Sequence, residues 1–162
     1  MSGKHQFALL RTRRFLPLFL TQFLGAFNDN FFKSALVMLI TFRLAEGSNL
    51  DPRILVNVAA GVFILPFFLF SAPASDLADR YDRAYLMRCV KFAEIVIMGA
   101  AAVGFQLQNM WVLLAVLFLM GAQSAFFSPA KFSILPQHLE EDELIAGNGL
   151  IQTGTYLAIL TG

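Results

Sequence analysis

The sequence predicts an all-α membrane protein, because its composition and its hydropathy pattern both point to this class. Hydrophobic residues make up 57% of the 162 residues and charged residues 14%, whereas about a quarter of a soluble domain is charged. A soluble chain of this size could not bury so much apolar side chain, since small globular proteins leave much of their surface in water. The formal net charge is +1, so we expect no nucleic-acid partner.

Five apolar segments follow one another, each near the length of about 20 residues that crosses the hydrocarbon core as a helix. The second contains Pro66 and Pro73, which predict kinks. We expect a tail over residues 1–14 and then a partial transmembrane domain over 15–162 with about four to five helices. The predicted spans are residues 15–44, 54–74, 85–107, 110–128 and, incomplete, 144–162.

The basic residues predict the orientation of these spans, because cytoplasmic flanks carry an excess of Lys and Arg. Several basic residues precede the first span, two arginines lie in the 75–84 linker, and Lys131 lies in the 129–143 linker, whereas residues 106–109 carry none. We therefore expect a multi-pass protein whose N-terminus and whose linkers 75–84 and 129–143 face the cytoplasm.

A polar patch interrupts the first apolar segment at Asn28, Asp29, Asn30 and Lys33. A charge at bilayer depth costs about 2.5–3.5 kcal/mol on insertion scales, so such residues face a bundle interior or a wet cavity. Asp29 and Lys33 are spaced i, i+4 and can pair on one helix face. Two interpretations stay open: a substrate or ion pathway, or a polar contact that locks the first helix to its neighbours.

The third segment repeats this pattern with Arg88, Lys91 and Glu94, three residues apart. At a rise of 1.5 Å per residue, Glu94 lies roughly 9 Å deeper than Arg88, which can extend to the interface. Lys91 and Glu94 can neutralise each other at i, i+3. A functional role and a purely structural ion pair are both open for this pair.

A weak internal repeat relates the first and fourth segments. Residues 23–32 align with 118–127 with four of ten positions identical, and Asn28 stands opposite Gln123. Chance matching is the alternative, because the chain has 18 Phe. A real repeat would make the two helices equivalent in an inverted-topology architecture, as in many secondary transporters.

The 75–84 linker reads Ser-Asp-Leu-Ala-Asp-Arg-Tyr-Asp-Arg over residues 75–83. It resembles the Gly-x-Leu-Ala-Asp-Arg-x-Gly-Arg signature of major facilitator superfamily transporters, which lies between their second and third helices. The resemblance implies a cytoplasmic conformational latch, here formed by Asp79, Arg80 and Arg83; we group Lys91 with it. Ser75 and Asp82 replace the two glycines of the signature, which puts the tightness of the turn in question.

Three further motifs resemble the bacterial lysophospholipid transporter branch of that superfamily. They are Phe-Asn-Asp-Asn at 27–30, Ser-Pro-Ala-Lys-Phe-Ser-Ile-Leu at 128–135 and Asn-Gly at 148–149. Phe132 replaces the Tyr of this family, and Asn28 replaces a Gly. The resemblance implies an incomplete inverted-repeat bundle in the bacterial inner membrane that moves lysophospholipid to the cytoplasmic leaflet, where it is re-acylated.

The polar residues suit such a substrate, because its headgroup carries a phosphate and often an amine. Asp29 could bind an ammonium, Lys33 a phosphate oxygen, and the two amides either group. Lys131 either attracts a headgroup at the cytoplasmic exit or anchors a helix that ends near Pro129. The expected substrate-binding residues are Asn28, Asp29, Asn30, Lys33 and Glu94.

Two other functions stay open: a facilitator-type exporter of small amphiphiles or drugs, and a membrane domain of a fused acyltransferase or acyl-activating enzyme.

The sequence has no metal cluster, nucleotide loop or nucleophile triad, so we expect neither enzyme activity nor a cofactor; a coupling cation is not identified. The expected partners are membrane lipid, lysophospholipid, the other helices of the same transporter, and an acyltransferase or acyl-activating enzyme, fused or separate.

The length sets a last expectation. Facilitator-type transporters have two six-helix halves with the substrate between them, whereas this sequence supplies about four and a half helices at about 20 residues per crossing. We therefore expect a fragment that ends inside a span at Gly162.

Overall fold

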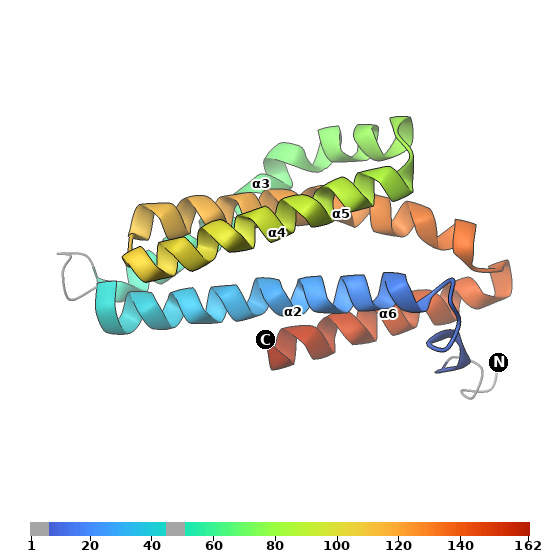
Figure 1. Cartoon of the computed structure of the whole chain (residues 1–162), viewed down its shortest axis with the longest axis horizontal. Coiled ribbons are helices and arrows are strands. Elements are labelled where there is room, and N and C mark those ends of the chain that lie inside the picture. Colours follow the sequence, from blue (N-terminus) through green and yellow to red (C-terminus); the bar gives the residue numbers. More distant parts are fainter. Residues whose placement is uncertain (1–6, 45–50) are drawn as a thin grey trace. The chain divides into compact units, whose positions relative to one another are not determined.

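The computed structural model describes residues 7–44 and 51–162, and its long elements are all helical (Figure 1). Each of the five predicted apolar segments forms a helix, which confirms the all-α prediction. Residues 1–6 of the predicted tail and 45–50 of the first linker lie outside the described residues. The elements are α2 (Leu16–Leu39), the π-helical turn η1 (Ile40–Leu44), α3 (Pro52–Arg80), α4 (Arg83–Leu107), α5 (Met110–His138) and α6 (Glu141–Thr161).

The helices form two compact units, which we describe separately. The first unit comprises the described part of Met1–Ser34 together with Lys131–Gly162, and the second comprises the described part of Ala35–Ala130. Because α2 and α5 cross these limits, each contributes residues to both units.

Helix α3 is longer than the predicted span 54–74, since it continues through most of the signature linker to Arg80. The chain then breaks at Tyr81 and Asp82, both with negative φ. Asp82 caps α4, because its Oδ1 accepts a hydrogen bond from Tyr85 N at 2.8 Å. The aspartate at the second glycine position of the signature therefore begins a helix, and the turn needs no left-handed residue there.

Helix α5 also exceeds its predicted span 110–128. It begins at a cap in which Asn109 Oδ1 accepts from Trp111 N and Val112 N at 3.0 and 3.2 Å. It then continues past Pro129 to His138. The expectation that a helix ends near Pro129 is wrong: the apolar run ends there, but the hydrogen-bonded helix does not.

In the first unit, α6 packs along α2 through glycines, and the two ribbons lie side by side in Figure 1. A Cβ at Gly154 would lie 2.6 Å from the Phe19 ring, and one at Gly162 would overlap the carbonyl oxygen of Phe27. Such small residues let membrane helices approach closely. The end of α6 therefore lies against α2 directly before the polar patch.

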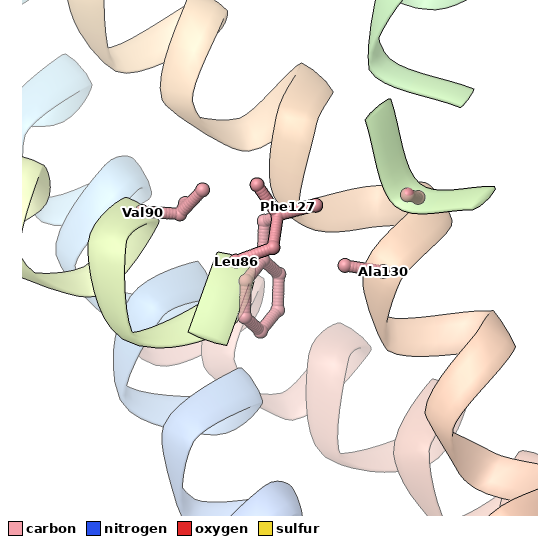
Figure 2. Packing of buried hydrophobic residues seen from close by; sticks show 5 residues of the cluster. Leu86, Val90, Phe127 and Ala130 are labelled. Carbon is pink, nitrogen blue, oxygen red and sulfur yellow. The ribbon is translucent and has the colours of Figure 1, made fainter. Parts of the chain in front are cut away.

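In the second unit, α5 packs against both α3 and α4. Gly121 approaches the Phe63 carbonyl in the turn before Pro66 so closely that a Cβ would overlap it. The Phe70 ring contacts those of Phe118 and Phe126, with centroids 6.3 and 5.7 Å apart. Near the end of α3, a buried apolar cluster joins the three helices; Figure 2 shows its members Leu86, Val90, Phe127 and Ala130.

Among the described helices, two are long and apolar enough to cross a membrane: α3 and the part Met110–Gln137 of α5. The sequence predicts four to five spans, the last of them incomplete. Helix α2 has sufficient length but carries the polar patch, which lowers its hydropathy.

Candidate functional site

The polar patch lies in the last turns of the α2 part of the first unit. Asn28, Asp29, Asn30 and Lys33 are all partly buried, and the Asp29 Oδ1 atom is inaccessible to solvent. Asp29 and Lys33 lie about one turn apart on the same helix, the spacing at which two side chains share a face. Asn30 Nδ2 donates to the carbonyl of Ala26 at 2.8 Å. The patch is thus a half-buried surface with both signs of charge.

Two polar contacts join α6 to α2 and to the chain directly before α2. Arg14 Nη2 donates to both carboxylate oxygens of Glu143 at 2.7 and 2.8 Å, and Gln22 Nε2 donates to Thr155 Oγ1 at 3.0 Å. The tail and the 129–143 linker, which we expect on the cytoplasmic side, therefore meet at one end of this unit.

A second polar group lies in the second unit, between α4 and α5. Lys91 Nζ and Glu94 Oε2 are 2.6 Å apart, with 24% and 12% of their side chains exposed. Gln123 Nε2 donates to the same carboxylate oxygen at 2.9 Å, and Lys91 Nζ lies 4.5 Å from the centre of the Phe127 ring. We call Lys91, Glu94, Gln123 and Phe127 the α4–α5 polar cluster.

The predicted latch residues lie at the end of α3 and the start of α4. Arg80 Nε pairs with Asp76 Oδ1 at 2.8 Å, one helical turn earlier, and both side chains are exposed. Asp79 is exposed and Arg83 is partly buried. An exposed pair of this kind contributes about 0–1 kcal/mol, so Arg80 can exchange its partner at little cost.

Lys131 is buried, with 7% of its surface exposed, and it lies within α5 rather than at a helix end. Its Nζ lies 4.5 Å from the centre of the Phe132 ring, so the aromatic ring that replaces the family's Tyr supplies a cation–π contact. A buried ammonium inside a continuous helix is a stronger candidate for anion binding than a solvated lysine would be.

The structure brings Lys91 together with Glu94, and it places Asp29 and Lys33 about one turn apart on α2. Both arrangements follow from local helical spacing. The structure also places Gln123 beside Glu94. The internal repeat aligns Gln123 with Asn28, but the sequence analysis assigns Gln123 to no site. An amide inside the apolar run 110–128 could have indicated such a site, because a buried amide in a membrane helix needs a hydrogen-bond partner.

Comparisons with known proteins are consistent with these features. The model of the Major Facilitator Superfamily matches residues 18–162, which is most of the chain. No solved structure matches the chain significantly.

The curated relatives of the chain include lysophospholipid transporters named LplT. The chain is 28% identical over 153 residues to the transporter of Photorhabdus laumondii, and this alignment covers 94% of the chain and 35% of the relative. It is 32% identical over 142 residues to the transporter of Escherichia fergusonii, with 87% of the chain and 32% of the relative covered. It is 30% identical to the transporter of an Enterobacter species, again with 87% of the chain and 32% of the relative covered. The chain therefore spans about a third of the length of these relatives.

Proposed function

This chain belongs to the major facilitator superfamily, and we propose that it takes part in moving lysophospholipid to the cytoplasmic leaflet of a bacterial inner membrane. The family makes it a multi-pass membrane protein. The proposal of this substrate is supported by the similarity to lysophospholipid transporters over 87–94% of this chain. The N-terminus then lies in the cytoplasm, and the lipid product passes to an acyltransferase or acyl-activating enzyme, fused or separate.

The chemistry of the polar patch supports this substrate class. Asp29 and Lys33 offer one acceptor and one donor of opposite charge on adjacent turns, so a headgroup with an ammonium and a phosphate finds a partner for each. Asn28 and Asn30 add amides that accept and donate. Because all four are partly buried, a headgroup bound here would be shielded from most of the solvent, and its charge pairing would be correspondingly stronger.

The other site residues take supporting roles in this proposal. Lys131, buried on α5, attracts the phosphate near the cytoplasmic exit, and Glu94 offers a second carboxylate for the ammonium. Asp79, Arg80 and Arg83 form the conformational latch at the α3–α4 turn, where the Arg80–Asp76 pair is exposed and easily exchanged.

The Asp29→Asn substitution tests the headgroup role with little change in shape. We expect uptake of labelled lysophospholipid by the full-length protein to fall to the background, with an unchanged amount of protein in the membrane, because the acceptor charge is lost. Asp51→Asn is the matched control, since Asp51 is an exposed cap of α3 whose Oδ1 accepts from Arg53 N, and asparagine caps equally well. Normal uptake by Asp29→Asn would contradict the headgroup role.

A further inference from the structure

The amide of Gln123 occupies a defined place in the α4–α5 polar cluster. It is 8% exposed, and its Nε2 donates to Glu94 Oε2 at 2.9 Å. We propose that Gln123 is a positioning residue, which orients the Glu94 carboxylate to receive the ammonium of a lysophospholipid headgroup. This inference rests on the proposed function and extends it to a residue on a second helix.

Two donors from two helices converge on one carboxylate oxygen. Lys91 Nζ reaches Glu94 Oε2 from within α4 at 2.6 Å, and Gln123 reaches it from α5. A carboxylate has about four acceptor positions on its two oxygens, so two donors gathered on Oε2 fix the rotation of the group and the place at which a cation meets it. A group that is already oriented binds its ligand without a further loss of rotamer freedom.

Phe127 makes an exchange of cations possible. It lies one helical turn beyond Gln123 on α5, and its ring holds the Lys91 ammonium at 4.5 Å. When a headgroup ammonium displaces Lys91 from Glu94, Lys91 retains this contact and can bind the headgroup phosphate. A zwitterionic headgroup adds no net charge to the buried cluster, so the exchange avoids leaving an unpaired charge.

An apolar groove adjoins the cluster at Gln123. It has a volume of about 360 Å³ and lies along α3, α4 and α5, with walls that include Leu86, Ile97, Leu119 and Phe126. Gln123 contributes the only amide or charged group among the described residues that line it. A ligand with a polar end at Gln123 and an apolar body along the groove is an amphiphile, which agrees with a lysolipid.

Transport by the full-length protein in lipid vesicles tests this role. Gln123→Met keeps the length of the side chain and removes the amide, and Gln106→Met, at an exposed position of α4, is the matched control. We expect Gln123→Met to raise KM for lysophosphatidylethanolamine about tenfold, as the loss of a hydrogen bond to a charged group does, at an unchanged maximal rate. KM for lysophosphatidylglycerol, which lacks the ammonium, should stay within about twofold of its wild-type value.

A double substitution separates positioning from mere packing. In a Glu94→Gln background, Gln123→Met should cause no further rise in KM, because the two residues act as one unit. An independent second rise, or an equal rise for both lipids, would overturn the proposal. If Gln123→Met accumulates poorly, Gln123→Asn replaces it. The shorter asparagine side chain does not reach Glu94, and we expect the same KM shift.

A chemical readout keeps the positioning role distinct from the proposed function. If the wild type moves no lysolipid, the proposed function fails, and labelling of Glu94 by a hydrophobic carbodiimide in the purified protein still decides whether Gln123 orients it. Carbodiimides attack carboxyl groups that they can reach, and loss of the Gln123 donor leaves the Glu94 carboxyl group less tightly held and so easier for the reagent to reach. Labelling should be faster in Gln123→Met and unchanged in Gln106→Met; equal rates in all three proteins would refute the positioning role.

Discussion

Gln22 of α2 and Thr155 of α6 are joined by a hydrogen bond of 3.0 Å between Nε2 and Oγ1. The same hydroxyl donates to the carbonyl of Ile151 at 2.8 Å, so Thr155 is satisfied on both sides. Gln22 is buried, and α2 and α6 pack closely nearby, where Gly154 faces the Phe19 ring. This bond therefore fixes the position of α6 along α2, one to two turns before the polar patch.

The first prediction concerns this link. Gln22→Leu and Thr155→Val should each lower the free energy of unfolding by about 0.6–1.7 kcal/mol, the range of interhelical hydrogen bonds in membranes. The double variant should lose no more than the larger single loss, because one bond is removed in all three. Unfolding in detergent micelles measures these values, with Gln152→Leu at an exposed α6 position as the control. Fully additive losses would show that the two side chains act separately.

The second prediction concerns the close approach of α5 to α3. Gly121→Ala should destabilise the protein by about 1–3 kcal/mol, as overpacking does, because its Cβ would meet the rigid backbone of Phe63. Gly61→Ala is the matched control, since nothing lies within 4 Å of a Cβ there, and it should stabilise α3 by up to about 1 kcal/mol. Thermal unfolding distinguishes the two; a neutral Gly121→Ala would mean that the helices separate readily.

The third prediction concerns the ion pair in the α4–α5 polar cluster. Lys91→Met should cost about 3 kcal/mol, because it leaves the Glu94 carboxylate without its cation in a mostly buried place. The double variant Lys91→Met with Glu94→Gln should be more stable than Lys91→Met alone, since the unpaired charge is gone. Equilibrium unfolding of the three proteins compares these values, and a double variant less stable than Lys91→Met would contradict this account.

The helices could largely be predicted from hydropathy, but their ends could not. Hydropathy reports where side chains suit hydrocarbon, whereas a helix ends where its backbone groups find other partners. Charged residues near Arg80 therefore did not stop α3, and Pro129 did not stop α5. The starts of the next helices follow capping side chains instead: Asp82 caps α4 and Asn109 caps α5. Asp82 was visible in the sequence as a possible cap, and weighing it would have placed the start of α4 at Arg83 rather than at residue 85.

The candidate site could be predicted only where its contacts are local. The spacing of Lys91 and Glu94 along one helix face was enough to predict their ion pair. Gln123 is 29 positions away from Glu94, so its role depends on how α5 packs against α4, which no local pattern specifies. The buried position of Lys131 likewise depends on packing, since its neighbours in the sequence suggested a helix end.

Lysophospholipid is the proposed substrate, and transport by the full-length protein in vesicles of defined lipid tests this most directly. The measurement compares uptake of labelled lysophospholipid with uptake of cationic dyes that drug exporters carry, each relative to protein-free vesicles. Our account predicts saturable movement of lysophospholipid and no movement of the dyes above that background. Movement of the dyes without movement of lysophospholipid would contradict it and favour a facilitator-type exporter of small amphiphiles.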